Sequence, residues 1–261
     1  MNIIDKYIKE KEKRKGLLIA YFPLANGKYD SVDLAKIYSA AGVDVLEIGI
    51  PVKNPYLDGD AIKTVMKGAL ELHKEIEWYM NEIKRIRKAC PEIVVEVFTY
   101  KETYSDTGLA AFTKKLKATG VDCALITDMN DEEFADYYKG EYEEEFDLLR
   151  FLPFNSSDQF VEDLSRMPMG GYVFLQAVDG KTGARKELQE GLEEKIRRAK
   201  RAFDIPVCVG FGISTPEHAS QITKMGADGI IIGSIAVSFV LNDTQEELKS
   251  KLRLYKQALQ N

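Results

Sequence analysis

The sequence contains few of the residues that build disulfide frameworks and metal sites. It has three cysteines and two histidines in 261 residues. Cys90, Cys123 and Cys208 are odd in number, lie far apart and have apolar neighbours, so we expect buried, reduced thiols. His73 and His218 lack the spacing of a ligand pair, and we expect both on the surfaces of helices. The sequence therefore predicts neither a disulfide framework nor a metal site, and it favours the cytoplasm.

The chain also lacks a long apolar run and a basic patch. No segment approaches the roughly 20 apolar residues that a membrane span needs, and the N-terminal stretch MNIIDKYIKEKEKRKG has no apolar core. The net charge is −6, and the densest basic stretch, KEKEKRK at 9–15, mixes both signs as a polar helix does. We therefore expect a soluble protein that binds neither membranes nor nucleic acids.

What the chain does contain is a regular alternation of two patterns. Short runs rich in Val, Ile and Leu predict strands, and the segments between them, with apolar residues three or four positions apart, predict helices. This alternation requires a parallel sheet covered by helices. The eight expected strands are 16–22, 43–50, 93–100, 121–127, 146–152, 171–177, 205–211 and 228–234.

Eight strand and helix units favour a closed (β/α)8 TIM barrel over an open doubly wound sheet. Three joints between helix and strand are alike, SAAGVDVLEIG, KATGVDCALIT and TKMGADGIIIG, which supports a repeated unit. We also expect an extra N-terminal helix and extra helices within 51–92, after the second strand. Because no linker or low-complexity segment divides the chain, residues 1–261 are expected to form one α/β domain.

Glu47 and Asp58 are the main candidates for chemistry. Glu47 lies inside the apolar strand LEIGI, where burial of a carboxylate is costly, and Asp58 lies in the loop that follows. Both positions belong to the carboxyl end of a barrel strand, where active sites lie. The pattern leaves two interpretations open: an acid/base pair, or an ion pair for Glu47 and a helix cap for Asp58.

Two glycine-rich turns predict a phosphate site. VGFGIST at 209–215 follows the seventh strand, and IIGSIAV at 231–237 follows the eighth. Loops at these two places bind phosphate in many barrels, because backbone N–H groups and a helix N-terminus face the anion. Gly212 and Gly233 would supply N–H groups and Ser234 a hydroxyl. The alternative interpretation is a pair of ordinary glycine-rich turns.

The segment AVDGKTGARKEL at 177–188 follows the sixth strand and would lie over the same mouth. Gly180 and Gly183 flank a charged turn with Thr182 at its centre. This pattern is typical either of a mobile lid or of a solvated loop.

Aromatic residues gather at the ends of the first, third and sixth strands. At such positions they either belong to the core or line an apolar pocket at the mouth, and their convergence favours the pocket. They are Tyr21, Phe22, Phe98, Tyr100 and Phe174.

Taken together, these stretches resemble the tryptophan synthase alpha subunit family over nearly the whole chain. The matching segments are LEIGIP, NPYLDGDAI, GVDCALITD, KTGAR, PVCVGFGISTPEHA and ADGIIIGS. The resemblance implies a lyase of tryptophan biosynthesis that cleaves indole-3-glycerol phosphate to indole and glyceraldehyde 3-phosphate without metal or organic cofactor. It places Glu47 on the family's catalytic glutamate, the acid/base at indole C3 and the glycerol hydroxyl. It places Asp58 on the aspartate that accepts the indole N–H.

The resemblance also assigns the remaining candidates. Thr182 falls on the lid threonine, while Gly183, Gly212, Gly233 and Ser234 fall on phosphate-binding positions. The residues on or beside the positions that line the indole pocket are Tyr21, Phe98, Tyr100 and Phe174.

Three loops depart from the family pattern. Val52, Lys53 and Asn54 replace Phe-Ser-Asp, YFPLANGKYDS replaces a T-[AL]-G-D-P turn, and Glu102 replaces the usual asparagine after the third strand. These loops face the mouth or the family's beta subunit, so the sequence leaves open whether a beta subunit binds. Besides the alpha-chain lyase, two functions stay open. One is a stand-alone lyase or a barrel enzyme acting on another aryl or sugar phosphate, and the other is a non-catalytic activator of a beta-type subunit.

Overall fold

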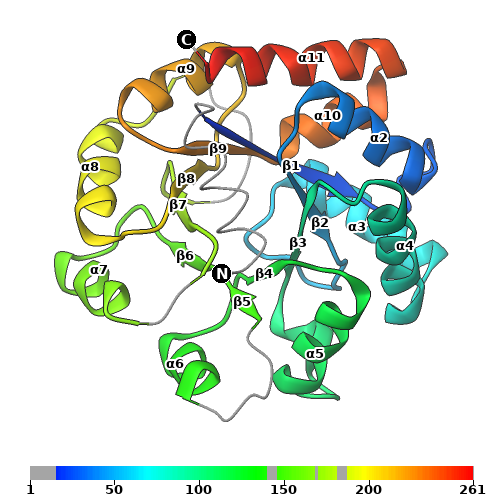
Figure 1. The fold of residues 1–261 in the computed structure, drawn as a ribbon, viewed down its shortest axis with the longest axis horizontal. Coiled ribbons are helices and arrows are strands. Elements are labelled where there is room, and N and C mark those ends of the chain that lie inside the picture. The colour runs from blue at the N-terminus through cyan, green and yellow to red at the C-terminus, as the bar shows by residue number, and fades with distance from the viewer. Residues whose placement is uncertain (1–15, 140–145, 168–169, 181–186, 261) are drawn as a thin grey trace.

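The strands form one parallel sheet that curves into a barrel, and the helices surround it (Figure 1). The computed structural model describes residues 16–139, 146–167, 170–180 and 187–260. The strands are β1 (Leu17–Pro23), β2 (Val45–Gly49), β3 (Val94–Thr99), β4 (Cys123–Ile126), β5 (Asp147–Leu148), β6 (Arg150–Leu152), β7 (Val173–Gln176), β8 (Val207–Gly210) and β9 (Gly229–Ile232). Every pairing between them is parallel.

Helices follow the strands around the outside of the barrel (Figure 1). They are α2 (Ser31–Ala41), α3 (Asp60–Leu72), α4 (Ile76–Ala89), α5 (Leu109–Thr119), α6 (Asp131–Lys139), α7 (Asp158–Ser165), α8 (Leu192–Ala202), α9 (Pro216–Lys224), α10 (Ser234–Asn242) and α11 (Gln245–Ala258), with a short 3-10 helix, η1 (Lys101–Tyr104). Both α3 and α4 follow β2, so the expectation of extra helices there is confirmed. The extra helix expected at the N-terminus lies outside the described residues.

The barrel closes through the fifth expected strand. The sheet runs in the order β5-β4-β3-β2-β1-β9-β8-β7-β6. Its two outer members, β5 and β6, are separated only by Leu149, whose N–H donates to the carbonyl of Ala124 at 2.8 Å. The segment therefore pairs with β4 in its first half and with β7 in its second. The predicted TIM barrel is confirmed, with one strand that changes partners midway.

The three similar joints do the same structural work at the amino ends of the strands. Each joint contains a glycine with positive φ, at Gly42, Gly120 and Gly226. A residue with a side chain would be strained in this backbone conformation. Each also has an aspartate whose Oδ2 accepts the backbone N–H of a neighbouring strand residue. These bonds join Asp44 to Leu18 (2.8 Å), Asp122 to Val95 (2.8 Å) and Asp228 to Val207 (2.7 Å). The repeat therefore aligns neighbouring strands at the end of the barrel opposite the mouth.

The cysteines and one of the histidines are buried. Cys90, Cys123 and Cys208 are free thiols inside the protein, as expected. The expectation for His218 is wrong, because it is buried in the first turn of α9, where its backbone N–H donates to Thr215 Oγ1 at 3.2 Å. His73 is half-buried and stacks on Trp78, with 3.7 Å between the ring centroids. Within the part of the chain that the structure describes, none of the helices combines the length and apolar character of a membrane span.

A glycine at the end of β2 makes room for an aromatic ring. A Cβ atom added to Gly49 would lie 1.9 Å from the hydroxyl oxygen of Tyr21 on β1. The Gly49→Ala substitution should therefore displace this ring and lower the free energy of unfolding by about 1–3 kcal/mol, as other overpacked cores do. Urea unfolding followed by circular dichroism measures the change.

Gly68 provides the matched control for that substitution. It lies inside α3, and a Cβ atom there would meet nothing within 4 Å. The Gly68→Ala substitution should raise the free energy of unfolding by about 0.5–1 kcal/mol, because alanine loses less backbone entropy than glycine when it folds into a helix. If both variants were equally stable, the close approach of Tyr21 to Gly49 would impose no constraint on the core.

Candidate active site

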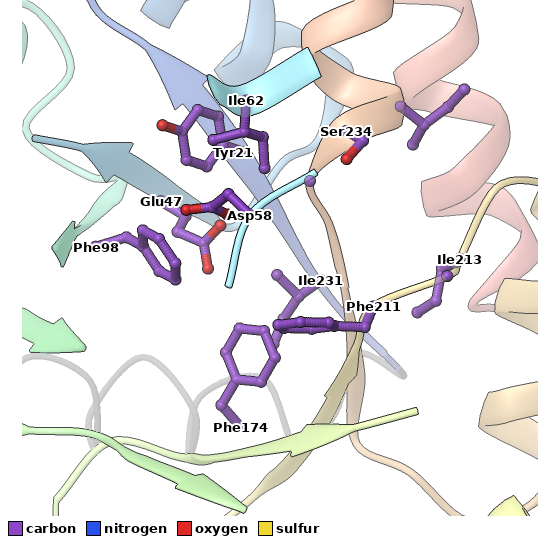
Figure 2. A pocket seen from close by; sticks show the side chains of 13 residues that line it. Tyr21, Glu47, Asp58, Ile62, Phe98, Phe174, Phe211, Ile213, Ile231 and Ser234 are labelled. Atoms are coloured by element: carbon purple, nitrogen blue, oxygen red, sulfur yellow. The ribbon is translucent and has the colours of Figure 1, made fainter. Parts of the chain in front are cut away.

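A cavity lies at the carboxyl ends of the strands (Figure 2). Its walls come from β1, β2, β3, β7 and β9, from the loops after β2 and β8, and from the first turns of α3 and α10. The lining residues are Tyr21, Glu47, Asp58, Ile62, Phe98, Phe174, Phe211, Gly212, Ile213, Ile231, Gly233, Ser234 and Ile235. The cavity thus joins an apolar chamber to two carboxyl groups and a glycine-rich end.

Glu47 and Asp58 lie together on one side of the cavity (Figure 2). Glu47 is 3% exposed on β2, and Asp58 is fully buried in the loop after it. One oxygen of each, Glu47 Oε1 and Asp58 Oδ1, is buried and has no hydrogen-bond partner within the described residues. Unpaired polar atoms are costly in a protein interior, so both carboxyl groups are placed for something other than local stability.

The structure does not support the purely structural interpretation of these two residues. Helix α3 begins after Gly59, and no side chain caps its first turn, so Asp58 is not its cap. Within the described part of the chain, the charged groups that act on Glu47 are other carboxyl groups, and no Lys or Arg is among them.

Burial raises the pKa of both carboxyl groups. For Glu47 the main cause is loss of hydration, and the carboxyl groups of Glu96 and Asp58 raise the pKa further. Burial also raises the pKa of Asp58, to about 6, against a hydrogen bond from Tyr100 that lowers it. Two acids whose pKa values differ in this way suit a site that needs one proton donor and one ionised carboxylate near neutral pH.

Tyr100 holds Asp58 rather than lining the cavity. Its hydroxyl group donates to Asp58 Oδ2 at 2.7 Å, and its ring packs against the edge of Phe98, with 6.1 Å between the centroids. Tyr100 is absent from the cavity wall. Of the five aromatic residues expected at the mouth, Tyr21, Phe98 and Phe174 line the cavity, whereas Phe22, like Tyr100, does not.

Phe211 is an aromatic wall that the sequence reasoning missed. It follows β8, and its ring meets that of Phe174 edge to face across 5.7 Å on the side opposite Glu47 and Asp58 (Figure 2). Its φ of 71° lies in the left-handed region, which costs a non-glycine residue free energy and is common at functional sites. Its place between the end of β8 and Gly212 was the available signal.

The glycine-rich end of the cavity lies at the N-terminus of α10. Gly233 is the N-cap of this helix and Ser234 its first residue, and Gly212 comes in from the loop after β8. Ser234 Oγ is buried and has no hydrogen-bond partner within the described residues. A helix N-terminus with a free hydroxyl and close backbone approach is an arrangement that binds phosphate. The structure thus brings these three predicted residues together.

The segment expected to form a lid is only partly described. Thr182 and Gly183 lie outside the described residues. Gly180 is described, has a φ of 103°, and its carbonyl accepts a hydrogen bond from Gln176 Nε2 at 2.7 Å. Gly180 is not part of the cavity wall.

The loops that depart from the expected pattern contact their surroundings. The backbone N–H of Lys53 donates to Glu102 Oε1 at 3.2 Å, so two of the changed positions touch each other. In the loop after β1, the hydroxyl of Tyr29 donates to the carbonyl of Asp243, beyond the end of α10, at 2.9 Å. Among the described residues, no group of three or more His, Cys, Asp or Glu side chains is arranged to hold a metal ion.

Comparisons with known proteins agree with this geometry. The family model described as tryptophan synthase alpha chain matches residues 7–261. The tryptophan synthase alpha chain of Leptospira biflexa is 32% identical over 249 residues, covering 94% of this chain and 93% of the relative. The tryptophan synthase alpha chain of Rippkaea orientalis is 29% identical over 249 residues, covering 94% of this chain and 92% of the relative. A solved structure from Aquifex aeolicus has a TM-score of 0.89 at 26% identity and covers 100% of both chains. Because the family model spans nearly the whole sequence, this chain belongs to the tryptophan synthase alpha chain family.

Proposed function

We propose that the chain is a lyase of tryptophan biosynthesis that cleaves indole-3-glycerol phosphate to indole and glyceraldehyde 3-phosphate. The supporting observation is the order of groups along one cavity. Two buried carboxyl groups lie beside an aromatic chamber, and the N-terminus of α10 lies at the other end. The substrate has the matching order of a ring, a glycerol hydroxyl and a phosphate. The chemistry proposed below needs only side chains of this chain and the substrate.

The aromatic chamber would hold the indole ring, and the carboxyl groups would act on it. Glu47, as a protonated acid, donates its proton to C3 of the indole, and the ring becomes electron-poor. Asp58, as a carboxylate, accepts a hydrogen bond from the indole N–H and stabilises the positive charge that forms. Glu47 then removes the proton of the glycerol hydroxyl, the bond from C3 to the glycerol carbon breaks, and its electron pair restores the ring. The hydroxyl carbon becomes the aldehyde, and Glu47 is again protonated.

The phosphate would bind where α10 begins. Gly212, Gly233 and Ser234 line the cavity beside this helix N-terminus, where their backbone N–H groups and the Ser234 hydroxyl would donate to the phosphate and the helix dipole favours an anion. Binding energy from this remote group would hold the indole ring against the carboxyl groups.

The Ser234→Ala substitution tests this end of the cavity. A hydrogen bond to a charged group is worth about 1.5–3 kcal/mol, so KM should rise about tenfold or more while kcat stays within about threefold. Inhibition by inorganic phosphate should weaken in parallel. Ser238→Ala, one turn further along α10, is the matched control, because Ser238 is absent from the cavity wall. An unchanged KM in Ser234→Ala would place the phosphate elsewhere.

The activity itself is tested with the purified chain. Release of glyceraldehyde 3-phosphate from indole-3-glycerol phosphate is followed in a coupled assay, with and without a tryptophan synthase beta subunit from the same source. Turnover in either case is the expected result. Absence of turnover in both cases would contradict the lyase and favour a non-catalytic activator. Strong activation by the beta subunit would contradict a stand-alone enzyme.

We also propose that the chain works in the cytoplasm, because its three cysteines are free thiols. We further propose a beta subunit as its partner. The loops that hold Lys53 and Glu102 contact each other beside the mouth and differ from the family pattern. A cognate beta subunit should therefore bind more tightly than one from a distant species. Analytical ultracentrifugation of the two mixtures compares them.

A further inference from the structure

A third buried carboxylic acid lies beside Glu47. Glu96 on β3 is the register partner of Glu47 on β2, and neighbouring strands are separated by about 4.8 Å. Glu96 is fully buried, and it faces the barrel interior because Phe98, two residues further along the strand, lines the cavity. Glu96 itself is not part of the cavity wall. It can therefore act on a substrate only through Glu47.

A tyrosine from the opposite side of the barrel donates a hydrogen bond to Glu96. Tyr172, just before β7, donates its hydroxyl group to Glu96 Oε2. The other oxygens, Glu47 Oε1 and Glu96 Oε1, are both buried without a hydrogen-bond partner in the described part of the chain. Because a hydrogen bond from a phenol favours the ionised form of its acceptor, negative charge on this pair is more stable on Glu96 than on Glu47.

Burial prevents the two glutamates from ionising together. Loss of hydration raises the pKa of both, and the charge of Glu96 raises the pKa of Glu47 further. The hydrogen bond from Tyr172 lowers the pKa of Glu96 but not that of Glu47. Because the pKa of Glu96 is raised to about 8, Glu96 is mostly protonated at neutral pH. As the pH rises above this value, Glu96 loses its proton first, and its charge then retains the proton on Glu47.

We propose that Glu96 is a positioning residue of this site: Glu47, Glu96 and Tyr172 form a buried acid pair in which charge is directed to Glu96 and the proton to Glu47. This inference rests on the proposed function, in which Glu47 starts the reaction as a proton donor. It adds that, on the alkaline side where Glu96 is ionised, the acid form of Glu47 is maintained by this neighbouring carboxylate as well as by burial.

The other ionisable groups that face the pair leave this assignment intact. Burial raises the pKa of Tyr21 on β1, Cys123 on β4, Tyr172 before β7 and Cys208 on β8, so all four are neutral at neutral pH. Among the described residues, Asp58 is the other carboxyl group that acts on Glu47, and its charge also disfavours ionisation of Glu47.

The Glu96→Gln substitution tests the pair. In kcat/KM measured against pH, loss of activity on the alkaline side reports loss of the Glu47 proton. Removing the neighbouring charge should move this alkaline limb to lower pH by about one unit or more, since coupled buried pairs interact by at least that much. Glu82→Gln on α4 is the matched control, because Glu82 is also buried but pairs with Arg85. If the alkaline limb of kcat/KM in the Glu96→Gln variant lies at the same pH as in the parent, or at higher pH, the proposal is wrong.

A second measurement separates the pair from the activity. Isotope-labelled carboxyl NMR without substrate follows the ionisation of Glu47, whose resonance is assigned by its absence in Glu47→Gln. The resonance should titrate at lower pH in Glu96→Gln, whether or not the chain cleaves indole-3-glycerol phosphate. If Glu96→Gln does not fold, the Tyr172→Phe variant is measured in its place. Loss of the hydroxyl group makes negative charge less stable on Glu96, so the Glu47 resonance should again titrate at lower pH. A Glu47 resonance that titrates as in the parent in the folded variant rejects the pair.

Discussion

Glu47→Gln is expected to lower kcat for indole-3-glycerol phosphate cleavage by about 100-fold or more, because it removes a general acid and base in one substitution. The amide has the same shape as the carboxyl group, so the cavity and KM should change little. The side chain is 3% exposed on β2 and lines the cavity, so it is placed to contact a substrate bound there. Steady-state kinetics in the coupled assay measure the loss.

The control for Glu47→Gln must separate chemistry from folding. Glu92→Gln, on the exposed turn before β3, removes a carboxyl group far from the cavity and should retain parental kcat. Glu47→Gln itself should unfold at the parent's urea concentration or above it, because near neutral pH Glu47 must take up a proton to be buried and a neutral amide need not. Activity of Glu47→Gln within about threefold of the parent would rule out its role as the proton donor.

The arrangement of strands was predictable because buried parallel strands leave a strong apolar signal. All eight expected strands are present, with ends that differ by a few residues. The division of the fifth into β5 and β6 was not predictable. It depends on Leu149 lying where the barrel closes and the segment exchanges β4 for β7, which is a property of the whole sheet.

The site was predictable where a residue contradicts its local pattern. Glu47 breaks an apolar strand, and the structure places it in the cavity wall with Asp58. Glu96 breaks the next strand in the same way, but its importance depends on its register with Glu47, which no single segment reveals. The left-handed backbone of Phe211 and the burial of His218 depend on tertiary contacts in the same sense.

The role of Tyr100 shows how far sequence position alone can mislead. Its place at the end of β3 predicts a pocket wall, whereas the structure turns its hydroxyl group to Asp58. A carboxylate that accepts the indole N–H must be ionised, and burial opposes ionisation. The hydrogen bond from Tyr100 is the main interaction that lowers the pKa of Asp58 and so opposes the effect of burial.

Asp58→Asn is expected to lower kcat by about 100-fold or more, since the positive charge on the protonated indole ring then loses the carboxylate that accepts the indole N–H. In the parent, the pKa of about 6 implies that activity falls as the pH drops through 6, because Asp58 becomes protonated. This acid limb should be absent in Asp58→Asn. A kcat within about threefold of the parent would contradict the role.

Tyr100→Phe provides a graded version of the same experiment, in which Asp58 remains. Loss of a hydrogen bond worth about 1.5–3 kcal/mol should raise the pKa of Asp58 by about one to two units. The acid limb then moves to higher pH, so activity falls about fivefold or more at pH 6 and recovers at alkaline pH. Tyr104→Phe, in η1 and packed on Phe112 with 5.4 Å between the ring centroids, is the matched control. If Tyr100→Phe lowered activity equally at every pH, Tyr100 would support the site by packing alone, and Asp58 would not owe its ionised state to this hydroxyl.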